Sequence, residues 1–182
     1  KTLLEDQSHE CRWVMCSQAS SIKINFMELA QRAGIGLPSH LGILINPHYG
    51  LWIGLRAALF STKTVDEIGF VEGQSIKRPC DDCSKPCISS CHYQAVTALG
   101  WDMKTCAKAH LLDDRRSLDP NSKCFASCDS RRACPIGMDY QHSELQHKYH
   151  YNRPIGRNML AKILGVEDHR KGDGPYWGRV FT

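Results

Sequence analysis

The chain has 182 residues, 42% of them hydrophobic, and a formal net charge of +4 with the histidines neutral. This length and composition predict a folded protein with one domain, or one domain and an insert. The most apolar window, residues 41–60, contains Asn46, Pro47, His48 and Arg56, which would be costly in hydrocarbon, so no transmembrane helix is expected.

The first residues of the chain predict a helix after an irregular start. Residues 1–21 show no clean period, and Cys11 and Cys16 have no Cys or His at ligand spacing. Both are interpreted as structural cysteines, with a redox role as the alternative. From Ile22, apolar residues recur at steps of three and four up to Gly34, which predicts an amphipathic helix of about three turns with a C-terminal cap.

A glycine-containing connection and two apolar runs follow. Gly34-Ile35-Gly36 is interpreted as a tight turn, since residues 38–39 (Pro-Ser) interrupt a phosphate-binding G-x-G-x-x-G pattern. The apolar runs 41–45 and 51–60, separated by turn residues 46–50, predict a strand–turn–strand unit. Residues 61–79 are polar and predict a connector.

Eight cysteines lie between residues 80 and 134, in two groups. The first group is Cys80-x2-Cys83-x3-Cys87-x3-Cys91, and the second is Cys106, Cys124, Cys128 and Cys134, which precedes Pro135. A buried structural cysteine is a small hydrophobe with no reason to recur at this spacing. The alternatives are disulfides in an exported protein and metal ligands in a cytoplasmic one, and the C-x2-C spacing favours metal and the cytoplasm.

The spacing favours iron–sulfur ligation. In two-cluster ferredoxins the run is C-x2-C-x2-C-x3-C-P, and the fourth Cys of each run ligates the other cluster. Here Pro86 is one extra residue and His92 replaces the usual proline. Crossed ligation predicts two [4Fe-4S] clusters, the first held by Cys80, Cys83, Cys87 and Cys134 and the second by Cys91, Cys106, Cys124 and Cys128. Two structural zinc sites in a zinc-stapled binding module are the alternative, although the chain has only one C-x2-C knuckle.

The two predicted clusters would also lower the net charge of the protein. Each assembly of cluster and four thiolates would carry about −2, so the net charge would fall to about zero. The pI of 8.5 therefore gives no support for a nucleic-acid partner. The expected partners are redox donor and acceptor proteins or a cofactor-bearing subunit.

The residues after the cysteines predict two helices and a tail. Residues 139–151 are rich in His, Gln and Tyr and predict a helix, and residues 157–164 predict a basic amphipathic helix that ends at Gly165. Residues 169–182 have turn residues and no period, so we expect an extended tail.

Several basic side chains near the cysteines have two interpretations. His142, His147 and His150 are too irregularly spaced to share one helical face, which favours a solvated helix surface over a third metal site. Arg131 and Arg132 precede Cys134, where their charge would stabilise a reduced cluster; simple surface solvation is the alternative.

Three segments carry a resemblance to a known superfamily. Residues 31–36 (QRAGIG) and 44–52 (LINPHYGLW), followed by the two cysteine groups, resemble the later half of epoxyqueuosine reductases and their relatives, the reductive dehalogenases. Residues 83–87 (CSKPC) and 131–135 (RRACP) are most similar to short 4Fe-4S ferredoxin-like members of that superfamily. The resemblance covers roughly residues 22–140.

The resemblance implies a fold class and a division of the chain. The implied fold is α+β, with a partial nitroreductase-like segment followed by a two-cluster ferredoxin-like lobe. The segment would occupy residues 1–75, the 4Fe-4S ferredoxin-like domain residues 76–140, and C-terminal helices and a tail residues 141–182. In the large relatives the clusters feed electrons toward a nitroreductase-like lobe that holds a cobalamin.

Departures from the family pattern bear on the reaction. Ser39-His40 stand where the family has Gly-Lys or Gly-Arg, and His40 is either a contact for a phosphate or corrin side chain or a turn histidine without function. Epoxyqueuosine reductases carry an acidic proton donor about fourteen residues before the Gly-x-Gly, which falls near Ser20 here. Much of the corrin-enclosing lobe would precede Lys1, as though the chain began inside a longer product.

The sequence therefore predicts an iron–sulfur electron-transfer protein, the redox module of an oxidoreductase, and no catalytic residue is assigned. The alternative is a cobalamin-dependent reductase of the epoxyqueuosine reductase or reductive dehalogenase type.

Overall fold

The computed structural model describes residues 11–15, 24–63, 76–111, 127–151 and 161–165. Within these ranges the protein mixes short helices with three two-stranded antiparallel sheets, which pair β1 with β4, β2 with β3 and β5 with β6. The strands are β1 (Cys11–Met15), β2 (Leu37–Pro38), β3 (Leu44–Ile45), β4 (Ala57–Ser61), β5 (Val96–Thr97) and β6 (Gly100–Trp101). The helices are α1 (Phe26–Arg32), α2 (Pro86–Ser89), α3 (Met103–Leu111), α6 (Asp129–Arg132), the 3-10 helix η1 (Met138–Tyr140) and α7 (Glu144–Tyr151). None of the helices in these ranges has the length and apolar character needed to cross a membrane.

The first predicted helix is confirmed as α1, but it begins later than expected. Asn25 precedes it and accepts a hydrogen bond from the backbone N–H of Glu28 on its side-chain oxygen at 3.2 Å, which is an N-terminal cap. The helix therefore begins at Phe26 rather than at Ile22, which lies outside the described residues. Gly34 follows the helix with a φ of 63°, so the predicted C-terminal signal is confirmed.

The predicted pairing of residues 41–45 with residues 51–60 is wrong. β3 pairs with β2, and β4 pairs with β1, where Trp13 lies opposite Leu59. The turn between the two runs is confirmed, since the Asn46 side chain accepts hydrogen bonds from two backbone N–H groups inside it. Gly36 permits the unexpected β2–β3 contact, because a Cβ there would lie 3.0 Å from the carbonyl oxygen of Ile45.

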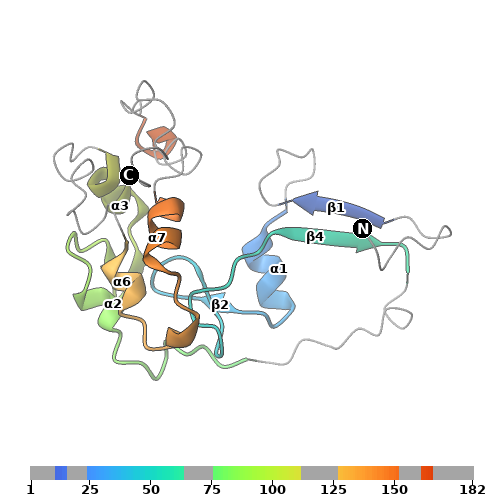
Figure 1. Cartoon of the computed structure of the whole chain (residues 1–182), viewed down its shortest axis with the longest axis horizontal. Helices are drawn as coiled ribbons and strands as arrows, with labels where there is room; N and C mark the ends of the chain where they lie inside the picture. The colour runs from blue at the N-terminus through green and yellow to red at the C-terminus, as the bar shows by residue number, and fades with distance from the viewer. Residues whose placement is uncertain (1–10, 16–23, 64–75, 112–126, 152–160, 166–182) are drawn as a thin grey trace.

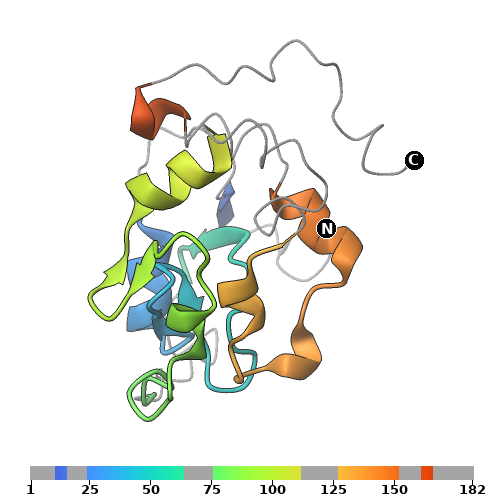
Figure 2. The same cartoon turned by 90° about the vertical axis from the view of Figure 1, so that its left-hand side faces the viewer.

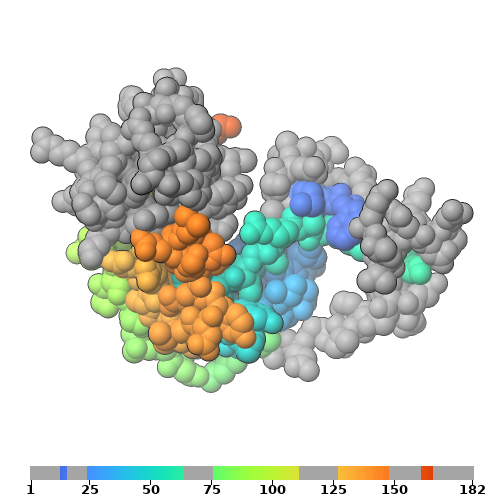
Figure 3. All heavy atoms as spheres, viewed as in Figure 1, coloured from blue at the N-terminus to red at the C-terminus, as the bar shows by residue number. Residues whose placement is uncertain are grey.

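The two parts of the chain lie apart in space. The β1–β4 ribbon and α1 lie on one side of the molecule, and α2, α3, α6 and α7 lie on the other (Figure 1). Residues 127–147, in orange, form much of the front surface beside the green cysteine segment (Figure 3).

The hydrophobic core around β3 includes cysteines. Ile45, Leu51, Cys80 and Cys134 form a buried cluster, and Leu41, Ile43 and Ile136 pack against it. The core therefore joins the β3 region, the first cysteine group and the last cysteine in one place. A protein that builds its core from potential ligands couples its folding to the state of those ligands.

Two glycines bring the 46–50 turn against the residues that follow Cys134. A Cβ at Gly50 would overlap the carbonyl oxygen of Ile136, and a Cβ at Gly137 would overlap the backbone of Tyr49. The φ values of 59° and 70° at these glycines suit residues without a Cβ. The side chains of His48 and Tyr140 complete the contact, with 2.6 Å between Nε2 and the phenol oxygen.

The C-terminal helices are confirmed in part. The predicted helix over residues 139–151 forms as α7 only from Glu144, and the short η1 lies before it. Residues 161–164 are helical and Gly165 has a φ of 67°, as predicted for the end of the second helix. Residues 157–160 and the predicted tail lie outside the described residues.

Candidate metal centre

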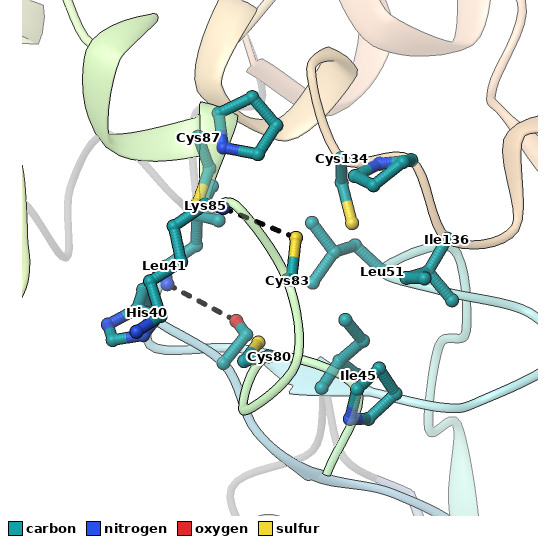
Figure 4. A pocket seen from close by; sticks show the side chains of 14 residues that line it. His40, Leu41, Ile45, Leu51, Cys80, Cys83, Lys85, Cys87, Cys134 and Ile136 are labelled. Carbon is teal, nitrogen blue, oxygen red and sulfur yellow. Dashed lines mark hydrogen bonds between the residues drawn. The ribbon is translucent and has the colours of Figure 1, made fainter.

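Four of the predicted ligands line one cavity. Cys80, Cys83 and Cys87 come from the first cysteine group, and Cys134 comes from the end of the second. Their sulfur atoms lie around the same space in Figure 4. The remaining lining residues are Ser39, His40, Leu41, Ile45, Leu51, Pro79, Lys85, Pro86, Pro135 and Ile136. The structure thus brings together all four residues assigned to the first cluster.

The irregular spacing of the first group has a local structural cause. Lys85 adopts the left-handed conformation, with a φ of 58°, and stands as the N-cap of α2. Pro86 is at the start of that helix, where a missing N–H costs nothing. The backbone N–H of Lys85 donates to Sγ of Cys83 at 3.3 Å, and the helix then carries Cys87. Lys85 therefore turns the chain between the second and third cysteines, and Pro86 begins the helix there.

The cysteines around the cavity influence one another's ionisation. Burial raises the pKa of Cys87, and Cys80, Cys134 and Cys83 raise it further as neighbouring anions. Burial also raises the pKa of Cys134, while the backbone N–H of Ile136 acts in the opposite direction. Four thiolates at this site would repel one another in a poorly solvated cavity, so their joint ionisation requires a bound cation or cationic cluster core.

Three further predicted ligands lie together in a second place. Burial raises the pKa of Cys106, and Cys128 and Cys91 contribute to the increase as neighbouring thiolates, while a hydrogen bond from the Trp101 side chain opposes it. α2 and α6 pack side by side, as both Figure 1 and Figure 2 show. This packing brings the first cysteine group near Cys128, which precedes α6. Cys124 lies outside the described residues.

Cys91 is surrounded by hydrogen-bond donors. Burial acts to raise its pKa, but hydrogen bonds from the backbone N–H groups of Val96, Tyr93 and Ala95 and from the Ser130 hydroxyl outweigh it and lower the pKa. The Ala95 nitrogen lies 3.2 Å from Sγ. The loop after Cys91 therefore stabilises a thiolate at this position.

The described cysteines of both groups are free thiols. Within the part of the chain that the structure describes, no group of three His, Cys, Asp or Glu side chains has a geometry that could hold a metal ion. The four sulfurs of the first set surround a cavity rather than converge on one point. Cys11 lies in β1, and Cys16 is outside the described residues, so their structural role stays a prediction.

A buried aromatic contact near the first cavity was missed by the sequence analysis. His147 is only 1% exposed, and its ring and that of His142 pack on Trp52 with centroid distances of 5.3 and 5.2 Å. The predicted solvated surface is therefore wrong for His147, because helical spacing gives no sign of a partner as far away in sequence as Trp52. The side chain of His150 is not among those described.

Arg131 belongs to the same contact. Its guanidinium lies 4.4 Å from the centre of the Trp52 ring, and Nη2 donates to the carbonyl oxygen of Leu51 at 2.5 Å. Surface solvation is therefore wrong for Arg131, which ties α6 to the residues that line the first cavity, whereas Arg132 is exposed.

Ser39 and His40 are buried and line the first cavity. The Ser39 hydroxyl donates to the carbonyl oxygen of Ile43 at 2.7 Å. Burial lowers the pKa of His40, and the positive charges of Arg78 and Lys85 lower it further. Burial and the two neighbouring cations therefore favour the neutral imidazole at the cavity wall.

The described residues combine short helices and small antiparallel sheets with a cysteine-lined cavity. Over 144 residues the chain is 27% identical to an epoxyqueuosine reductase from Synechococcus sp. (strain RCC307), a match that includes 77% of this chain and 42% of that protein. The chain thus spans less than half the length of the curated relative it matches. No family model and no solved structure matches the chain. The similarity supports a distant relation to the epoxyqueuosine reductases.

Proposed function

We propose that this chain is an iron–sulfur electron-transfer protein with two [4Fe-4S] clusters, acting as the redox module of an oxidoreductase. Cys80, Cys83, Cys87 and Cys134 would hold the first cluster, and Cys91, Cys106, Cys124 and Cys128 the second. The observation that supports the proposal is the way the cysteines gather. Cys134 lines the cavity of the first group, and Cys128 and Cys91 act as neighbouring thiolates on the pKa of Cys106.

The donor chemistry supports this proposal. Thiolates are the ligands of [4Fe-4S] clusters, which accept and donate single electrons when bound. The predicted ligands at the first cavity are sulfurs, and the apolar side chains of Leu41, Ile45 and Leu51 exclude water from it. Backbone N–H groups directed at Cys83 and Cys91 would stabilise the more negative, reduced state.

The chain itself would therefore hold the clusters, exclude water and tune their potentials. We propose redox donor and acceptor proteins, or a cofactor-bearing subunit, as its partners in the cytoplasm. We further propose that residues 1–75 are the partial nitroreductase-like segment that the sequence resemblance implies.

Metal analysis tests the proposal directly. Protein purified without oxygen should be brown and contain about eight irons and eight sulfides per chain, as two [4Fe-4S] clusters require. Reduction should produce electron paramagnetic resonance (EPR) signals of two centres. A colourless protein with two zinc ions per chain would instead identify a zinc-stapled binding module.

Three cysteine-to-serine variants test the proposed crossed ligation, in which the last cysteine of each group binds the cluster of the other group. If the assignment is correct, Cys134→Ser and Cys87→Ser abolish the same EPR signal, and Cys106→Ser abolishes the other. Each variant should retain about half of the iron. If the cysteines instead act group by group along the sequence, Cys134→Ser will remove the signal that Cys106→Ser removes. Cys11→Ser is the control and should leave the iron content unchanged.

A cobalamin-dependent reductase is the second candidate, and the similarity to a protein named epoxyqueuosine reductase favours it. In that case His40 and Ser39 would stand at the wall nearest the cofactor, as the sequence resemblance implies. Titration of the iron-loaded protein with cobalamin should then shift the cobalamin absorption spectrum. An unchanged spectrum at saturating protein would remove this candidate for the chain.

A further inference from the structure

Lys85 has a strained backbone conformation between two of the predicted ligands. Its φ of 58° lies in the left-handed region, which residues with a Cβ, other than Asn and Asp, rarely adopt. Pro86 follows directly, and steric contact pushes a residue before proline toward extended backbone. Strained backbone of this kind persists where the surrounding structure requires it, and it is concentrated at functional sites. The conformation of Lys85 is therefore maintained by the contacts that it makes.

Both backbone polar groups of Lys85 are used in this conformation. The N–H donates to Sγ of Cys83 at 3.3 Å, and the dashed line in Figure 4 shows it directed at that sulfur. The carbonyl oxygen accepts a hydrogen bond from the backbone N–H of Ile88 at 3.0 Å. Because Pro86 has no N–H, the Lys85 N–H is the last backbone donor before α2 begins. The left-handed turn thus aims a donor at a sulfur of the first site and starts the helix that carries Cys87.

The same residue brings a positive charge to the first cavity. Lys85 lines the cavity together with the four cysteines assigned to the first cluster, and it is half-buried. Among the described residues that line the cavity, it is the single Lys or Arg. Its charge lowers the pKa of His40, which also lines the cavity, so the field of the ammonium group reaches the site. Charges interact more strongly in such a poorly solvated place than in water.

We propose that Lys85 raises the reduction potential of the first cluster, by directing its backbone N–H at Sγ of Cys83 and by placing its ammonium charge beside the cavity. This inference rests on the proposed function. Reduction transfers one electron from the redox donor to the cluster and so adds one negative charge. A donor to a ligand sulfur and a nearby cation both stabilise the reduced state more than the oxidised state. Loss of either contribution should therefore lower the potential of the first centre and leave that of the second unchanged.

An EPR-monitored redox titration of the iron-loaded protein with dithionite tests the contribution of the charge. Lys85→Met removes the ammonium group but keeps a flexible chain of similar length. The first centre is identified as the one whose signal Cys87→Ser removes. In Lys85→Met its potential should fall by about 59 mV, which corresponds to a tenfold change in the equilibrium constant for one electron. Lys85→Arg should restore the potential, and Lys162→Met, at an exposed lysine outside the cavity, should shift neither centre.

Lysine that carries ¹⁵N at its α-nitrogen tests the backbone donor without altering the fold. The electron spin-echo envelope modulation spectrum of the reduced first centre should show a coupled ¹⁵N nucleus. Lys85→Gly is the matched control, because glycine suits the left-handed conformation and keeps the N–H, but its nitrogen is not labelled. The coupling should disappear there, and the potential should equal that of Lys85→Met.

A purely structural role of Lys85 would lower the iron content of these variants without moving the potential of the clusters that remain. The inference would be overturned by an unchanged potential of the first centre in Lys85→Met, or by the absence of ¹⁵N coupling in the labelled wild-type protein. Wild-type protein without iron would overturn the proposed function instead.

Discussion

The two cysteine sites differ in what surrounds their sulfurs. At the first site, Cys80 and Cys134 belong to the hydrophobic core itself, together with Ile45 and Leu51. At the second site, Cys91 and Cys106 are half-buried and receive hydrogen bonds from the adjoining loop and from Trp101. The first site is thus built into the packing of the protein, and the second is surrounded by polar donors.

This difference assigns different properties to the two sites. An apolar wall makes each added negative charge more costly, whereas N–H donors stabilise it. If the two proposed clusters are bound, the first should therefore have the more negative potential, and electrons would pass from the first to the second. Because the first site shares the core, its loss should also affect folding more than loss of the second.

Substitution of Gly50 tests the dependence of the first site on the core, and it should have the largest effect. Gly50→Ala places a methyl group against the carbonyl oxygen of Ile136, two residues after Cys134. The left-handed φ of 59° alone costs a residue with a Cβ about 1–2 kcal/mol, and the overlap adds to this. The melting temperature should fall by about 4 °C or more, and the signal of the first centre should be lost before that of the second.

Gly165→Ala is the matched control for this substitution. Gly165 has a similar φ of 67°, but a Cβ there would have no neighbour within 4 Å. This variant should keep both centres at wild-type occupancy. Equal loss of the two centres in Gly50→Ala would contradict the view that only the first site is built into the core.

Thiol alkylation distinguishes the sites by a smaller, pH-dependent effect. Cys91 has a lowered pKa and Cys106 a raised one, although both are half-buried. The thiolate is the reacting form, so in reduced, iron-free protein Cys91 should react with iodoacetamide at a lower pH than Cys106. Cys87 and Cys134, whose pKa values are raised by burial, should react last. Mass spectrometry of each cysteine peptide between pH 6 and pH 9 measures this order, and equal profiles for Cys91 and Cys106 would contradict it.

Local spacing predicted the parts of the fold that depend on neighbouring residues. The steps of three and four before Gly34 identified α1, and turn residues identified the 46–50 loop. The strands were not predictable in the same way, because β1 has only five residues and its partner β4 lies far along the chain. The two-residue β2 and β3 are too short to show a period at all.

The candidate site shows the same division. The cysteines were identified from spacing, and Cys134 lines one cavity with Cys80, Cys83 and Cys87. The crossed ligation itself stays a prediction. Spacing could not reveal the donors to Cys91, which depend on the backbone path of the next residues. It also missed the burial of His147, whose contact is the distant Trp52. Long-range packing and the direction of the backbone after each cysteine could therefore not be predicted from the sequence.

The ion pair between His92 and Asp129 offers the smallest and most local test of the second site. Its two side chains join the residue after Cys91 to the residue after Cys128, with 2.8 Å between Nε2 and Oδ2. They are 48% and 33% exposed, so solvent screens the pair and its coupling should be about 0.2–1 kcal/mol. His92→Ala, Asp129→Ala and the double variant should each lower the melting temperature by at most about 4 °C, and by similar amounts.

The Glu28–Arg32 pair on α1, at 2.7 Å, is the control for this effect, because it lies on the side of the molecule away from the cysteine helices. Removing it should change stability by a similar small amount and leave both EPR signals as they are. Removing His92 or Asp129 should change the line shape of the second centre alone, since α2 and α6 then lose the polar contact that aligns Cys91 with Cys128. A change in the first centre instead would contradict the assignment of Cys91 and Cys128 to the second site alone.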